Sequence, residues 1–111
     1  MRQAKVFYQN HFAGILTETN EGEYIFRYEE EYVRKFPSDM ITFSMPVSRF
    51  AYHDKRLFPF FEGLIPEGWL LDIASESWKI NKNDRMGLLL TCCKNCIGAV
   101  SIEPIISRDE E

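Results

Sequence analysis

Three neighbouring cysteines, Cys92, Cys93 and Cys96, are the residues whose type and spacing first suggest chemistry. Cys93 and Cys96 form a C-x-x-C pair, as in zinc sites and dithiol redox centres. A structural zinc needs four ligands, but the only further candidates are Cys92, which would point away from Cys93 on a helix, and the isolated His11 and His53. The pair is expected at a helix end, where the dipole does not lower a thiol pKa. We therefore expect small packing residues, and a redox or zinc module using Cys93 and Cys96 is the less favoured hypothesis.

Other catalytic patterns are missing from the sequence. There is no Walker-type or dinucleotide-binding glycine motif and no kinase catalytic loop. Ser44 and Ser48 lack a G-x-S-x-G context, and Glu62, Glu67 and Asp72 are expected to serve as acids at helix starts and faces. We therefore predict a protein that is not an enzyme and that needs no cofactor and no metal.

The composition predicts one globular domain. The chain has 111 residues, 45% of them hydrophobic, and a formal net charge of −4, which argues against broad contact with nucleic acid. Arg49, Lys55 and Arg56 lie among aromatic residues, as in some sites for single-stranded nucleic acid, but we expect them to belong to an ordinary solvated loop. No signal peptide or membrane-spanning run is visible. The cysteines are clustered and odd in number, which indicates a reducing, cytoplasmic location. We expect a domain over residues 1–106 and a flexible acidic tail over 107–111.

Hydrophobic alternation predicts the strands. A hairpin should turn at Asn10 and His11, because asparagine tolerates positive φ, and a polar turn follows at 20–23. Arg49 to Leu57 lacks periodicity and is expected to be a loop, and Pro104 is expected to end the last strand. The expected strands are Val6–Gln9, Ala13–Thr19, Tyr24–Tyr28, Thr42–Met45 and Ile97–Ile102.

Two helices are predicted between the fourth and fifth strands. The first should begin at Pro66 and end near Lys79, and the second should run from Asp84 to about Cys93 with Asn81 or Asn83 as N-cap. The core face expected for the second helix comprises Met86, Leu89, Leu90 and Cys93. The order predicts an α+β fold, a small antiparallel β-sheet or partial barrel packed against two to three helices.

The two tryptophans of the first predicted helix differ in position. Trp78 falls inside the apolar face, whereas Trp69 lies at its boundary beside a turn formed by Ile65, Pro66, Glu67 and Gly68. An exposed tryptophan on a rigid turn would be a typical interface anchor. Alternatively, Trp69 packs on the preceding aromatic residues, which are Phe58, Phe60 and Phe61.

The sequence resembles the N-terminal subdomain of HipA-type toxin kinases. FFEGLIPEG at 60–68 looks like the family's FF-x-x-LLPEG signature, NDRMGLL at 83–89 like its D-x-(F/M)-x-LL helix, and CIGAV at 96–100 like its DC-x-GA(V/L) strand. The opening hairpin, with Val6, Asn10, Gly14 and Leu16, and the TFSMP stretch at 42–46 also match. His11 replaces a turn glycine of the family and Asn95 an acid.

The resemblance implies a function in trans. In that family the subdomain precedes a serine/threonine kinase core, which this sequence lacks, and the chain is similar to the stand-alone HipS-like protein of split HipBST-type toxin–antitoxin systems. It implies a non-catalytic antitoxin-like protein that binds a HipA/HipT-like kinase and neutralises it. A HipB-like helix-turn-helix protein would be an indirect partner that contacts the DNA. The partner-binding residues implied are Phe61, Ile65, Pro66, Glu67, Gly68 and Trp69. The alternative is a structural or regulatory subunit that completes a split HipA-like kinase.

Overall fold

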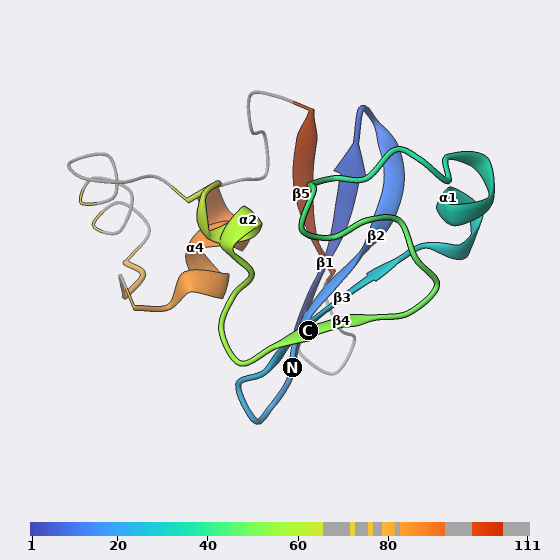
Figure 1. Ribbon diagram of the computed structural model, residues 1–111. Coiled ribbons are helices and arrows are strands. Elements are labelled where there is room, and N and C mark those ends of the chain that lie inside the picture. Colours follow the sequence, from blue (N-terminus) through green and yellow to red (C-terminus); the bar gives the residue numbers. More distant parts are fainter. Residues whose placement is uncertain (66–71, 73–75, 77–78, 82, 93–98, 106–111) are drawn as a thin grey trace.

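Five antiparallel strands form one sheet in the order β4-β3-β2-β1-β5 (Figure 1). A computed structural model of the protein describes residues 1–65, 72, 76, 79–81, 83–92 and 99–105. The strands are β1 (Arg2–Tyr8), β2 (His11–Glu18), β3 (Tyr24–Tyr28), β4 (Tyr52–Asp54) and β5 (Val100–Ile105). Helices α1 (Glu30–Lys35), α2 (Pro59–Glu62) and α4 (Arg85–Cys92) accompany them. The predicted α+β class with a small antiparallel sheet is confirmed.

The β1–β2 hairpin differs slightly from its prediction. The two turn residues are Gln9 and Asn10, with φ of 49° and 69°, and His11 already pairs with Tyr8. Positive φ at both central positions is the geometry of a tight hairpin turn, which matches the twist of the strands. The predicted turn at Asn10 and His11 was therefore one residue too late.

One face of the sheet carries the hydrophobic core. Ala4, Val6, Leu16 and Phe26 are fully buried because alternate residues of paired strands point to the same side. A Cβ on Gly14 would lie 2.4 Å from the carbonyl oxygen of Arg27, so β2 and β3 can approach this closely only with glycine there.

The fourth strand was placed wrongly. Thr42 and Met45 form only an isolated bridge, and β4 lies at Tyr52–Asp54, inside the stretch expected to be a loop. The Tyr28 hydroxyl donates a hydrogen bond to the Met45 carbonyl and accepts one of 3.1 Å from the Ile41 amide. This buried hydroxyl thus holds an irregular segment against the sheet, and burial raises the pKa of Tyr28 to about 12.

Helix α1 was not among the predicted helices, which were both placed after the fourth strand. Its Tyr32 is 3% exposed, and the ring lies 5.9 Å from that of Tyr28 and 5.2 Å from that of Phe36. Glu31 also pairs with Arg34 one helical turn later. One aromatic residue therefore attaches an otherwise charged helix to the sheet.

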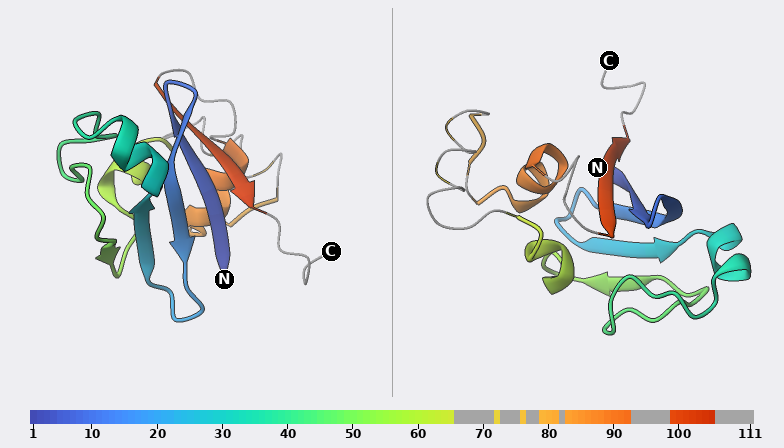
Figure 2. Two further views of the ribbon diagram at one scale, coloured as in Figure 1. Left: turned by 90° about the vertical axis from the view of Figure 1, so that its right-hand side faces the viewer. Right: turned by 90° about the horizontal axis from the view of Figure 1, so that it is seen from above.

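Helices α2 and α4 lie side by side, away from α1 (Figures 1 and 2). In α4, Met86, Leu88 and Leu89 are fully buried, whereas Leu90 is half-buried. Met86 and Leu89 were predicted correctly, Leu88 was missed, and Leu90 was placed too deep. The predicted helix from Pro66 to Lys79, with its two tryptophans, and Cys93 and Asn95 lie outside the described residues, apart from a few isolated positions.

Strand β5 corrects two further predictions. It begins at Val100 rather than Ile97, and Pro104 lies within it, opposite Ala4 of β1, instead of ending it. Proline is tolerated there because β5 is an edge strand, on which an amide can be missing without loss of a ladder bond. Ile102, 1% exposed, adds the last part of the sheet's buried face.

Candidate partner-binding site

A short helix leads into the predicted partner-binding turn. Phe58 precedes α2 with extended backbone, and Pro59 takes the first helical position, where the missing amide is not needed. Overlapping turns then continue past the helix, since Leu64 donates to the Phe61 carbonyl at 3.0 Å and Ile65 to the Glu62 carbonyl at 3.2 Å. The backbone entering the turn is therefore hydrogen-bonded up to Ile65.

Two of the six predicted partner-binding residues belong to the core. Phe61 is 0% exposed, with ring centroids 5.6 Å from Phe26 and 5.3 Å from Phe60, and Ile65 is 3% exposed. Their side chains fix the beginning of the turn to the sheet. Pro66, Glu67, Gly68 and Trp69 lie outside the described residues.

The two helices beside the turn are tied together at their polar ends. The Arg85 guanidinium and the Glu62 carboxylate are 2.6 Å apart. Asp84 is the N-cap of α4, because its Oδ1 accepts the Gly87 amide at 3.1 Å. The predicted caps were Asn81 or Asn83; instead the Asn81 side chain accepts the Asn83 amide at 2.8 Å, which shapes the turn before the helix.

A charge network joins this helix start to the sheet. Arg2 of β1 donates to both oxygens of Asp84, at 2.7 and 3.0 Å, and to Glu18 of β2 at 2.7 Å. The Tyr24 hydroxyl donates to the other oxygen of Glu18 at 2.9 Å. Because Arg2 and Asp84 are 82 positions apart, sequence patterns gave no signal for this contact.

The network shifts the pKa values of its members. The hydrogen bond from Arg2 lowers the pKa of Asp84, and the same bond raises that of Arg2. Burial, followed by the bond to Glu18, raises the pKa of Tyr24 to about 12, so its hydroxyl stays protonated at neutral pH. The hydrogen bond between Arg2 and Asp84 therefore favours the charged forms of both side chains, and the Tyr24 hydroxyl donates to Glu18.

A pocket opens beside this joint, between sheet and helices. It has a volume of about 510 Å³. Its lining comes from the β2–β3 turn, from β3, from the chain after β4, from α2 and from Arg85 at the start of α4. No sequence pattern indicated this pocket, because its residues are distant in sequence and form no motif.

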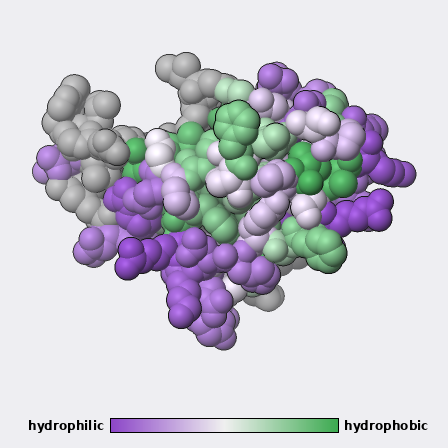
Figure 3. All heavy atoms as spheres, in the orientation of Figure 1, coloured by the Kyte–Doolittle hydropathy of each residue, from purple (hydrophilic) through white to green (hydrophobic). Residues whose placement is uncertain are grey.

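A second surface feature consists of two exposed aromatic residues. Phe43 is 90% exposed and Phe50 is 82% exposed, both in the irregular segment between α1 and β4. On the face of the molecule that Figure 3 shows, hydrophobic residues gather in the middle and hydrophilic ones toward the periphery. Exposed phenylalanines of this kind can contribute to protein contacts.

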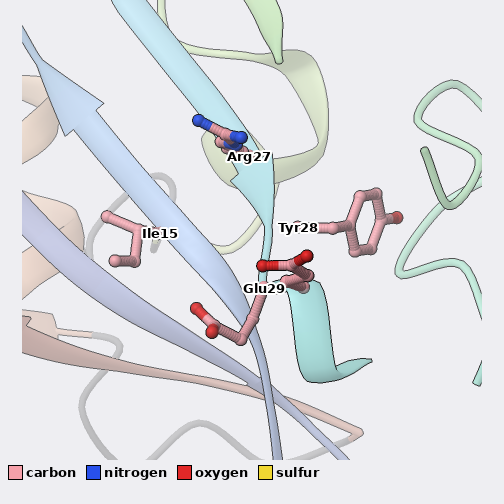
Figure 4. A pocket seen from close by; sticks show the side chains of 5 residues that line it. Ile15, Arg27, Tyr28 and Glu29 are labelled. Carbon is pink, nitrogen blue, oxygen red and sulfur yellow. The ribbon is translucent and has the colours of Figure 1, made fainter. Parts of the chain in front are cut away.

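The remaining polar sites offer less. A pocket of about 260 Å³ near the end of β3 is lined by Ile15, Arg27 and Glu29, with the Tyr28 ring directed away from Ile15 (Figure 4). His11 is exposed, and its ring centroid lies 4.6 Å from that of Phe36. The described residues contain no group of three metal-ligand side chains and no helix long and apolar enough to cross a membrane. Cys93 and Cys96 lie outside those residues.

Comparison with known proteins gives a consistent family assignment. A family model described as "HipA N-terminal domain" matches residues 4–103. An uncharacterised protein of Haemophilus influenzae is 34% identical over 103 residues, which is 93% of this chain and 92% of that protein. A solved structure titled "N-terminal domain of HipA toxin" superposes with a TM-score of 0.73 at 26% identity, covering 97% of this chain and 96% of the other. The chain therefore belongs to the HipA N-terminal domain family.

Proposed function

We propose that this protein binds a HipA/HipT-like serine/threonine kinase in trans and neutralises it, as a HipS-like antitoxin. The observation that carries the proposal is the likeness to the N-terminal domain of a HipA toxin, which superposes on this chain with a TM-score of 0.73. The resemblance implies that this domain precedes a kinase core in the family, so we expect it to carry a surface suited to such a kinase. Binding without catalysis also suits a sequence with no catalytic motif.

The turn after α2 is the proposed contact surface. Phe61 and Ile65 position the beginning of the turn and do not contact the kinase, because their side chains are buried in this chain. Pro66, Glu67 and Gly68 shape the turn, and Trp69 is the anchor that enters the kinase. A tryptophan anchor loses little conformational entropy on binding, because its side chain has only two torsions, which favours affinity.

The test is a binding and inhibition experiment with a HipA/HipT-like kinase. The kinase is incubated with the wild-type chain, with Trp69→Ala, or with Phe43→Ala, which removes an exposed aromatic ring elsewhere. We expect Trp69→Ala to weaken binding by at least about 2 kcal/mol, or roughly thirtyfold, and to abolish inhibition, as for hot-spot anchors.

The matched control defines the surface. Phe43→Ala should bind and inhibit as the wild type does, and both variants should keep the wild-type urea midpoint. Loss of binding with Phe43→Ala alone would place the contact on the segment between α1 and β4 and would contradict the proposed turn.

A second candidate function is completion of a split kinase. It is favoured by the structural relative, in which the same fold is the N-terminal domain of a HipA toxin. In that case the wild-type chain raises phosphorylation by the partner instead of lowering it. The same assay therefore distinguishes the two, and a HipB-like DNA-binding protein would join either complex indirectly.

A further inference from the structure

We propose that the pocket between sheet and helices is an anion site that takes a phosphomonoester group. The lining includes none of the six proposed partner-binding residues, and the proposal does not depend on the kinase-binding function. Its residues converge from distant parts of the chain, as in a preformed ligand pocket, and its volume of about 510 Å³ lies within the range of about 300–1,000 Å³ typical of small-ligand sites.

The charges that line the pocket are mostly positive, although the whole chain has a net charge of −4. Lys55, Arg56 and Arg85 line it together with one carboxylate, Glu62. Glu62 is paired with Arg85, so the lining carries a surplus of two positive charges. A phosphomonoester carries close to two negative charges at neutral pH, which this surplus would balance.

Two of these cations are available to a ligand. Lys55 and Arg56 are exposed, and neither forms an ion pair within the described part of the chain. The Arg56 amide donates to the Asp54 side chain at 3.2 Å, which holds the turn after β4 and brings the two cations to the pocket. An Asx turn of this kind limits the freedom of the backbone that carries them.

The third cation is held by the fold. Arg85 follows the N-cap Asp84, and its side chain is 29% exposed and bound to Glu62 at 2.6 Å. A partly desolvated guanidinium interacts more strongly with an anion than a solvated one does. Arg85 is therefore the fixed side of the pocket, and Lys55 and Arg56 form the adjustable side.

The apolar part of the lining gives the pocket its shape. Leu57 is 6% exposed and belongs to the core, and Pro59 starts α2. Tyr24 presents its ring rather than a donor, because its hydroxyl proton is bound to Glu18. The cationic heads therefore supply the donors, and the apolar residues of the lining can contact the group that carries the phosphate.

The experiment is an NMR titration of the full ¹⁵N-labelled chain at constant ionic strength. The probes are inorganic phosphate, AMP and O-phosphoserine, and the variants are Lys55→Gln with Arg56→Gln, and the matched pair Lys5→Gln with Arg49→Gln. The matched pair removes two exposed positive charges outside the pocket.

We expect saturable phosphate-dependent shifts of the amides of Gly22, Lys55 and Arg85 in the wild type and in the matched pair. Binding should weaken by about tenfold or more when Lys55 and Arg56 are neutralised, because two charge-assisted contacts are lost. Tighter binding of AMP would indicate a nucleotide, and tighter binding of phosphoserine a phosphorylated side chain. Shifts that do not saturate, or that fall equally in both double variants, would overturn the proposal.

Discussion

Asp84 combines two stabilising roles in one carboxylate. It caps α4 through the Gly87 amide, and it binds Arg2 with both oxygens. Its approach to the helix depends on Gly87, since a Cβ there would lie 2.4 Å from the Asp84 Oδ2. Removal of this side chain therefore affects both the end of α4 and its contact with the sheet.

The two roles of Asp84 can be separated by substitution and pH. Asp84→Asn keeps the cap and removes the charge, whereas Asp84→Ala removes both and should cost about 1 kcal/mol more. The folded-state pKa of Asp84 is lowered, so its ionic contribution is present above the ordinary value of 3.8 and is lost as the pH falls through the lowered value. As the pH falls below 3.8, the free energy of unfolding measured in urea should thus decrease more steeply for the wild type than for Asp84→Asn. Parallel pH profiles would show that the ion pair contributes nothing, as for many exposed pairs.

At the scale of elements, α4 contributes the side chains of Leu88 and Leu89 to the hydrophobic core. Both side chains are fully buried, whereas Leu90 is only partly covered. Leu89→Ala should lower the free energy of unfolding by about 2–5 kcal/mol, and Leu90→Ala by clearly less, because less apolar surface and a smaller cavity are involved. Both substitutions replace leucine by alanine in the same helix, so they change helix propensity equally. The difference between their urea midpoints therefore reports the difference in burial. Equal midpoints would refute the observed helix orientation.

Elements with a strong hydrophobic period could be predicted from the sequence, and those without one could not. The alternation of Tyr24–Tyr28 gave β3 correctly because one face of that strand is buried. In contrast, β4 has three residues, of which His53 and Asp54 are exposed, and it exists through backbone pairing with β3. Helix α1 is hidden in an acidic run because Tyr32 alone among its residues is buried. Neither element shows a periodic signal.

At the scale of the whole molecule, contacts between distant segments could not be predicted from patterns in the sequence. The turn signature at 60–68 identified the proposed contact surface through a resemblance, but the burial of Phe61 and Ile65 required the fold. The anion pocket likewise exists only once β3, the chain after β4, and both helices meet. Local patterns report on neighbours along the chain, and tertiary contacts decide which polar side chains converge.

The pairing of β1 with β5 makes the last strand essential to the domain. Strand β5 covers the edge of β1, and its Val100 and Ile102 are 7% and 1% exposed. Removal of residues 100–111 takes away two core side chains, each worth about 2–5 kcal/mol, from a domain whose total stability is expected to be about 5–15 kcal/mol. We expect the chain of residues 1–99 to lose its cooperative thermal transition in circular dichroism.

A second truncation tests the predicted tail. Removal of residues 107–111 leaves β5 complete, so the free energy of unfolding measured in urea should stay within about 0.5 kcal/mol of the wild-type value, as for changes away from packed features. A cooperative transition in the 1–99 chain would show that β5 is dispensable. A large loss on removing 107–111 would mean that the domain extends beyond the predicted boundary at residue 106.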